Sequence, residues 1–169
     1  MIKQFVPQEF CIKCQGCCRF KEENSVWSPC LLDEEVQEFL DKPGIPAASI
    51  TIDRRIQPIA NPAGADFICP FLGTSDNKCK VYNIRPFECQ LYPFLINLRK
   101  SKVLLTVDLN CPYVYQAINS QEAKDYIVYL TNYLNSSPLR LMLKDNPQII
   151  QAYEEVREVA ELSLPDETK

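Results

Sequence analysis

The sequence contains no histidine, only four glycines, and no apolar run of the roughly 20 residues that a membrane span needs. Without histidine, the common acid–base schemes and the Cys–His nucleophile are excluded. The scarcity of glycine also argues against a glycine-rich loop that would hold a nucleotide. The first residues carry neither the apolar stretch of a signal peptide nor a lipidation motif. These absences predict a cytoplasmic protein with no membrane partner.

Charge of either sign shows no strong excess. Eighteen lysines and arginines stand against 22 aspartates and glutamates in 169 residues, which leaves a net charge of −4. This balance lacks the basic footprint of nucleic-acid-binding proteins, so no nucleic acid is expected as a partner. Residues 120–169 hold five basic and nine acidic side chains and therefore carry the whole net charge. We expect this acidic part to pack on the rest of the chain, and its alternative role is to bind an unknown protein partner.

Nine cysteines are the most informative feature of the sequence. An odd number, in a chain without an export signal, argues against a disulfide framework. Cys30 stands alone between apolar neighbours and reads as a buried cysteine that acts as a small hydrophobe. The other eight are candidate metal ligands: Cys11, Cys14, Cys17, Cys18, Cys69, Cys79, Cys89 and Cys111.

The segment 11–18 holds four of these cysteines and reads C-x2-C-x2-C-C. A C-x2-C spacing lets two thiolates reach one metal ion from a tight turn, and Gly16 would supply the positive φ that such a loop often needs. Cys17 and Cys18 are adjacent, and neighbours in an extended chain point to opposite sides. They would then serve different centres or opposite sides of a polynuclear one. Zinc and iron–sulfur clusters both accept four thiolates, so the metal stays open.

The remaining cysteines lie in motifs of their own. Residues 69–72 read C-P-F-L, residues 79–94 read C-x-V-Y-x2-R-P-x2-C-x2-Y-P-F, and Cys111-Pro112 follows. Together with segment 11–18, these motifs resemble the YkgJ-type cysteine-cluster family, described as a zinc- or iron-chelating domain, over residues 11–112. The resemblance implies a bound metal but no particular reaction. Similar cysteine patterns occur in flagellin lysine N-methylases, so the resemblance also implies methyl transfer as an alternative.

Three functions follow from these motifs. The first is a cysteine-cluster metalloprotein that binds iron–sulfur clusters or zinc, with a redox or electron-transfer role. Cysteine followed by proline, as at Cys69 and Cys111, is frequent in ferredoxins and favours iron–sulfur. The second is a cluster-dependent enzyme such as a protein lysine N-methylase, and the third is a zinc-stabilised protein-interaction module. Arg85 would bind a sulfur, a carbonyl or a substrate carboxylate, or brace its loop, while Tyr82 and Tyr92 would cover the metal.

The expected fold class is α+β. We predict a small cysteine-rich metal-binding module with a short β-hairpin, packed against C-terminal helices. The chain is expected to be one domain over residues 1–169, with a cysteine-cluster part over 1–115 and a helical part over 116–169. The hairpin consists of strands over 94–98 and 103–107, and its reversal would bring Cys89 and Cys111 near each other.

The other elements follow from local patterns. Helices are predicted near 33–41 and 86–92, and the second places Cys89 in a first turn, where the helix dipole stabilises a thiolate. Residues 49–53 are predicted as a short strand. C-terminal helices are expected to begin at Asn119 or Ser120, at Ser137 and at Asn146. Apolar stripes mark the first and the last of these helices: Ala123, Tyr126, Ile127, Leu130, Tyr133 and Leu134, then Ile149, Ile150, Tyr153, Val156 and Ala160.

Overall fold

The computed structural model describes residues 2–14 and 16–163. Their contacts gather into two compact units, of which the first holds Ile2 and residues 6–90 and the second holds residues 3–5 and the chain from Leu91 onward. Helices and small antiparallel sheets together make up the fold, which confirms the predicted α+β class. The predicted division at residues 115 and 116 stays a prediction.

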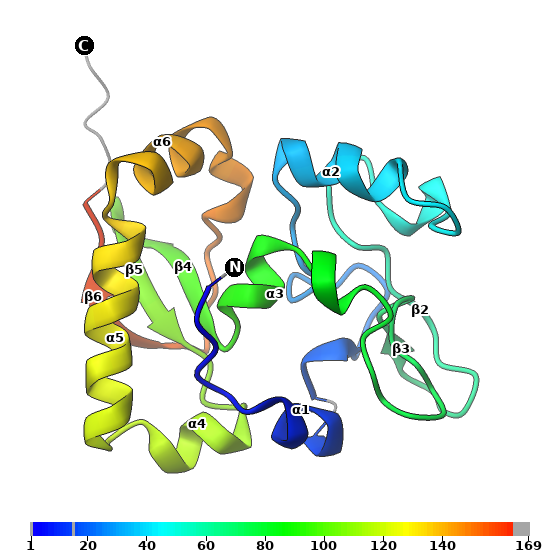
Figure 1. Ribbon diagram of the computed structural model, residues 1–169, viewed down its shortest axis with the longest axis horizontal. Helices are drawn as coiled ribbons and strands as arrows, with labels where there is room; N and C mark the ends of the chain where they lie inside the picture. The colour runs from blue at the N-terminus through cyan, green and yellow to red at the C-terminus, as the bar shows by residue number, and fades with distance from the viewer. Residues whose placement is uncertain (1, 15, 164–169) are drawn as a thin grey trace. The chain divides into compact units, whose positions relative to one another are not determined.

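Short elements build the first unit. They are α1 (Gln8–Cys14), η1 (Gly16–Cys18), β1 (Arg19–Phe20), α2 (Asp33–Leu40), η2 (Ala47–Ser49), β2 (Ile59–Ala60), β3 (Phe67–Ile68), η3 (Tyr82–Ile84) and α3 (Phe87–Leu91). The helices predicted near 33–41 and 86–92 are confirmed. Strand β3 lies between β1 and β2 and is antiparallel to both. Figure 1 labels β2 and β3.

Strands of two residues cannot stabilise a unit by pairing alone. The first unit is instead held by one apolar cluster that gathers residues from the strands, α2 and the loops. Its buried members are Phe20, Leu31, Phe39, Ile56, Ile68, Cys69, Phe71 and Leu72. Phe39 is fully buried and meets Phe71 edge to face, with ring centroids 5.5 Å apart.

The strand predicted over residues 49–53 is wrong. Only Ile50 makes a bridge there, an isolated one to Ile56. The hydroxyl of Thr51 accepts the backbone N–H four residues further along at 2.9 Å, and Arg54 takes a φ of 63°. The chain therefore reverses at once, because side chain–backbone hydrogen bonds compete with a strand ladder.

The second unit combines one sheet with helices. Its elements are β4 (Phe94–Arg99), β5 (Lys102–Val107), α4 (Pro112–Ala117), α5 (Gln121–Leu134), α6 (Ser137–Asp145), η4 (Pro147–Ile149) and β6 (Arg157–Glu161). The predicted hairpin is confirmed as β4 and β5. Its loop is only Lys100 and Ser101, whose φ values of 50° and 63° suit the tight two-residue turns that match strand twist.

Helix α5 begins and packs as its sequence predicts. The Ser120 hydroxyl accepts the Ala123 N–H at 3.1 Å and caps the helix. Ala123, Tyr126, Leu130 and Leu134 are buried on one face, and α5 runs along the sheet of β4, β5 and β6 in Figure 1. No helix in the described part of the chain combines the length and the apolar character needed to cross a bilayer.

The long helix predicted from Asn146 is wrong. A single 3-10 turn, η4, is followed by extended chain that ends in β6, the third strand of the sheet. Asn97 of β4, which is fully buried, explains the difference. Its amide donates to the Tyr153 carbonyl at 2.9 Å and its carbonyl accepts the Tyr153 N–H at 3.1 Å. Ile149 and Tyr153 are thus buried outside any α-helix, and Ile150, Val156 and Ala160 are only half-buried.

Glu35 links the starts of two helices in the first unit. Its two carboxylate oxygens accept the N–H of Leu32, at 2.9 Å, and the N–H of Phe87, at 2.6 Å. Burial raises the pKa of this carboxyl group from 4.5 to about 7. Between these values the folded protein keeps a proton that the unfolded chain has released. This contribution to stability is therefore full below pH 4.5 and is lost as the pH rises through 7.

Replacement of Glu35 by glutamine isolates this effect, because glutamine does not titrate. We expect the free energy of unfolding of the wild type, taken relative to E35Q, to fall by about 3 kcal/mol between pH 4.5 and pH 8. Urea unfolding of the reduced, metal-free proteins measures it. A difference between the two proteins that does not change with pH would contradict the assignment.

Candidate metal centre

The pairing of β1 with β3 brings two cysteine motifs together. Strand β1 begins directly after Cys18, and β3 ends directly before Cys69. Because the strands are antiparallel, these two ends lie side by side, and the N–H of Cys69 donates to the carbonyl of Cys18 at 2.9 Å. Residues more than 50 positions apart in sequence are thereby neighbours.

A tight turn then returns Cys79 to the same place. Cys79 forms an antiparallel bridge with Leu72, and the Gly73 N–H donates to the Lys78 carbonyl at 2.8 Å. A Cβ on residue 73 would displace the Asp76 carboxylate and lie 3.2 Å from the Lys78 carbonyl, so this turn favours glycine. Both ends of the turn are thus fixed.

The chain then runs through η3 and α3, which place Cys89. Pro86, the predicted first residue of the helix, lies one position before α3, where its missing N–H has no partner to lose. Cys89 is the third residue of this five-residue helix. The segment 79–89 therefore contributes a cysteine at each end.

Four thiols from these segments influence one another: Cys17, Cys69, Cys79 and Cys89. Cys79 and Cys17 both raise the pKa of Cys69 by their charge, and Cys17 also raises that of Cys79. All three raise the pKa of Cys89. Interactions of this kind require short separations. The fold therefore brings these four cysteines, which are distant in sequence, close to one another. We call them the thiol group.

Burial is the main cause of the raised pKa values in the thiol group. It raises the pKa of Cys69 to about 12 and raises those of Cys79 and Cys89. For Cys17, an exposed residue, a hydrogen bond with Cys18 is the largest cause, and desolvation of its sulfur comes second. The prediction that a helix start stabilises the Cys89 thiolate is wrong, because one and a half turns of helix do not offset burial among like charges.

Backbone amides point at two of the sulfurs. The N–H of Phe71 hydrogen-bonds to the Cys69 sulfur, and the N–H of Val81 hydrogen-bonds to the Cys79 sulfur. The N–H of Leu72 donates to the Cys69 carbonyl at 3.0 Å. Each of the bonds to sulfur favours the thiolate form of its cysteine. The sequence reasoning named the cysteines but missed these donors. The C-P-F-L motif was the available signal, since proline after cysteine turns the following amides back toward the sulfur.

The motifs and the geometry agree with a comparison to known proteins. The profile of the CxxCxxCC family, described as "Putative zinc- or iron-chelating domain", matches residues 10–112. The chain belongs to the CxxCxxCC family. This confirms the resemblance inferred from the motifs, and with it the zinc or iron that the family is described as chelating.

Comparison with individual proteins gives one short match. "Uncharacterized protein MJ0661" of Methanocaldococcus jannaschii is 42% identical over 41 residues. This match covers 24% of the chain and 22% of that protein, so the chain corresponds to about a fifth of its relative's length. No solved structure matches the chain.

The C-x2-C-x2-C-C segment of the CxxCxxCC domain differs from expectation at two points. Gly16 does not take a left-handed φ, and a Cβ there would lie 3.5 Å from the Cys14 sulfur, an ordinary contact. Cys17 and Cys18 lie in the 3-10 turn η1 rather than in extended chain, and their thiols hydrogen-bond to each other. They therefore do not point to opposite sides. Cys11 and Cys14 are exposed in α1.

Two predicted site residues belong to the second unit. Cys111 is buried at the N-terminal cap of α4, and the Tyr92 hydroxyl donates to the Asp108 carboxylate at 2.9 Å. Cys89 lies in the first unit. The shared site of Cys89 and Cys111, and the role of Tyr92 as a cover for the metal, stay predictions.

Cys30 stands apart from the thiol group. It is 1% exposed, its N–H donates to the Glu88 carboxylate at 2.6 Å, and burial raises its pKa to about 11. These surroundings suit the predicted role of a buried small hydrophobe.

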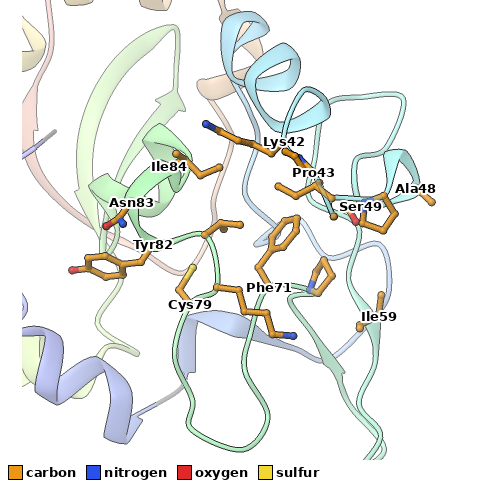
Figure 2. A pocket seen from close by; sticks show the side chains of 16 residues that line it. Lys42, Pro43, Ala48, Ser49, Ile59, Phe71, Cys79, Tyr82, Asn83 and Ile84 are labelled. Atoms are coloured by element: carbon orange, nitrogen blue, oxygen red, sulfur yellow. The ribbon is translucent and has the colours of Figure 1, made fainter.

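A groove of about 750 Å³ opens beside the thiol group in the first unit. Figure 2 shows the Cys79 side chain on its wall, with Phe71 and Tyr82 on either side of it in that view. Lys42 and Lys80 also line the groove, so it combines apolar walls with two cations. The sequence reasoning did not anticipate this groove, because its lining comes from five separate stretches of chain.

Proposed function

We propose that the CxxCxxCC domain holds one zinc or iron centre through the thiolates of Cys17, Cys69, Cys79 and Cys89. The convergence of distant cysteine segments is the observation that carries the proposal: the Cys69 N–H donates to the Cys18 carbonyl at 2.9 Å, and Cys79 forms a bridge with Leu72. The influence of these four thiols on one another's pKa values agrees with it. Zinc and iron–sulfur centres both accept four thiolates. Since protein ligands would fill the coordination sphere, the proposal favours a structural or electron-transfer role over hydrolysis.

The surroundings of the thiol group fit a thiolate-bound metal. Amide donors already face the sulfurs of Cys69 and Cys79, as they do around thiolates that must stay charged. In residues 2–14 and 16–163, no three cysteines, aspartates or glutamates have the spacing of a formed metal site. Binding therefore has to draw the sulfurs closer together.

The other predicted ligands are Cys11, Cys14, Cys18 and Cys111. We propose that Cys11, Cys14 and Cys18, which belong to the first unit, take part in a second centre, and Cys111 stays a predicted ligand. Cys14 and Cys18 flank the short stretch that holds Cys17, so a metal bound there would lie near the first. A second centre predicts roughly two metal ions per chain instead of one.

Anaerobic purification followed by a visible spectrum and by iron, zinc and sulfide analysis tests the proposal. A brown protein with matched iron and sulfide would establish an iron–sulfur centre and support a redox role. A colourless protein with about one zinc ion per chain would establish a structural centre. A reduced, folded protein that binds neither metal would contradict the proposal. Cys30→Ala, outside the thiol group, is the matched control and should keep its metal.

The groove beside Cys79 favours a second candidate, a cluster-dependent enzyme such as a protein lysine N-methylase. A substrate in the groove would lie next to a metal ligand. Calorimetry of the metal-loaded protein with S-adenosylmethionine tests this candidate. Binding that disappears on chelation would support it, and the absence of binding to the metal-loaded protein would contradict it.

The exposed side chains of the helical part favour a third candidate, a zinc-stabilised interaction module in the cytoplasm. Val128 of α5 and Leu141 of α6 are 60% and 57% exposed, and Glu122 and Asp125 are exposed on α5. We propose that a protein partner would bind this acidic surface. A stable complex in pull-downs that is lost in V128E/L141E would support it, and a complex unaffected by both substitutions would contradict it.

A further inference from the structure

Arg85 is a charged residue of the first unit whose buried donors have no partner among the described residues. Its backbone, at φ −60° and ψ 143°, is restrained by Pro86, because a residue before proline is disfavoured in the helical region. The Gln90 side chain donates to its carbonyl at 3.0 Å. Both restraints come from residues of the same motif, and they fix the position of the Arg85 backbone from which the side chain extends.

The guanidinium group is fixed as well. Its central carbon lies 4.1 Å from the centroid of the Tyr82 ring, a cation–π contact that sets the plane of the group. The Nε and Nη2 atoms are buried, and neither has a hydrogen-bond partner among the described residues. These two N–H groups share one edge of the guanidinium and form the fork that binds two acceptors side by side.

An unpaired buried donor is costly, and more so when it is charged. No carboxylate forms an ion pair with Arg85 in the described part of the chain. The arginines that do pair with carboxylates there are Arg19, Arg54, Arg55 and Arg99. The buried Glu88 carboxylate accepts the Cys30 N–H instead. Arg85 belongs to the segment 79–89, which has a candidate ligand at each end. The ring of Tyr82 fixes its guanidinium, and the Tyr82 N–H donates to the Cys79 carbonyl at 3.3 Å. The thiol group is therefore the nearby set of groups that becomes a strong acceptor once a metal binds.

We propose that Arg85 is a positioning residue of the metal centre, whose Nε–H and Nη2–H donate to metal-bound sulfurs of the thiol group. This inference rests on the proposed four-thiolate site. A neutral thiol is a weak acceptor, whereas a metal-bound thiolate is a strong one. Four thiolates around one divalent ion carry a charge of about −2, and Arg85 compensates half of it. Metal binding thus satisfies the donors that are otherwise unpaired.

Substitution of Arg85 should weaken metal binding without changing its stoichiometry. We expect R85Q to bind zinc about 10- to 100-fold more weakly, the usual effect of losing a partner of a ligand. R85K keeps the charge but loses the fork, so its affinity should fall between those of R85Q and the wild type. Hydrogen bonds to sulfur lower the energy of its lone pairs. The thiolate-to-cobalt charge-transfer band of R85Q should therefore move to longer wavelength.

Titration with Co²⁺, followed by displacement with Zn²⁺ against a chromophoric chelator, measures both quantities in the full chain. Arg54→Gln is the matched control, because Arg54 belongs to the same unit but pairs with Asp33 at 2.7 Å. It should show the affinity and the band of the wild type. If R85Q bound metal as tightly as R54Q and with the same band, the role of Arg85 would be overturned and the four-thiolate site would stand. A wild-type protein that binds neither ion would overturn the proposed function itself.

A second variant covers the case in which R85Q does not fold. Tyr82→Leu removes the ring beneath the guanidinium but leaves its charge in place. We expect several-fold weaker zinc binding and a smaller shift of the cobalt band in the same direction. If a folded Y82L protein had the zinc affinity and the cobalt band of the wild type, Tyr82 would not fix the guanidinium of Arg85 for these hydrogen bonds.

Discussion

Cys69→Ser is expected to reduce the metal content of the purified protein to less than about a tenth of the wild-type value. Cys69 is buried, its pKa is raised by the charges of Cys79 and Cys17, and its sulfur receives the backbone N–H of Phe71. Serine keeps the shape but stays protonated at neutral pH, so it leaves a three-thiolate site. Since structural zinc binds with apparent free energies of roughly 10–16 kcal/mol, the lost ligand should also lower the melting temperature of the first unit.

Metal analysis by mass spectrometry and circular dichroism melting measure these two effects. Cys30→Ala is the control, because it also removes a buried thiol from the first unit. It should cost about 1 kcal/mol of stability and keep the full metal content. Full metal content in C69S would exclude Cys69 as a ligand.

The second large effect is expected in the second unit. Asn97→Ala should lower the free energy of unfolding by about 3 kcal/mol, because it leaves the buried N–H and carbonyl of Tyr153 unpaired and opens a cavity. These groups now bond to the Asn97 amide at 3.1 and 2.9 Å. Urea unfolding measures the change.

Leu98→Ala is the matched control for N97A. Leu98 is the next residue of β4 and is 47% exposed, so its truncation should change stability by less than about 0.5 kcal/mol. Equal effects of the two substitutions would show that the amide of Asn97 does not hold the segment around Tyr153.

Local signals predicted the elements that local interactions build. Helix α5 could be predicted because its cap, Ser120, and its apolar stripe are both visible in the sequence. The hairpin of β4 and β5 could be predicted from two β-branched and aliphatic runs close together. In each case the hydrogen bonds that define the element join residues only a few positions apart.

The wrong predictions have a different origin. Residues 146–160 have a helical pattern of apolar residues, but the N–H and carbonyl of Tyr153 bond to Asn97, 56 positions earlier, and residues 157–161 pair with β5. A tertiary partner of this kind leaves no trace in local periodicity, and it overrides helix propensity. The failure at residues 49–53 is local instead, since the Thr51 hydroxyl offered a turn that alternation of apolar residues does not reveal.

The candidate site was predictable as a set of cysteines but not as a geometry. Spacing alone identified eight candidate ligands, and the grouping of Cys17, Cys69, Cys79 and Cys89 came only from the structure. That grouping depends on the pairing of β1 with β3, each two residues long. Strands this short carry no periodic pattern. The unpaired donors of Arg85 were equally invisible, because burial is a property of the whole unit.

The distance along the chain between the cysteines of the thiol group bears on how the first unit folds. Cys17 and Cys89 are 72 positions apart. A metal ion that joined them would close a loop of that length, and in the chain-entropy treatment of cross-links this removes about 4 kcal/mol of freedom from the unfolded chain. The ion would thus act as a reversible cross-link, and the supply of metal during synthesis would decide how quickly the unit reaches its native state.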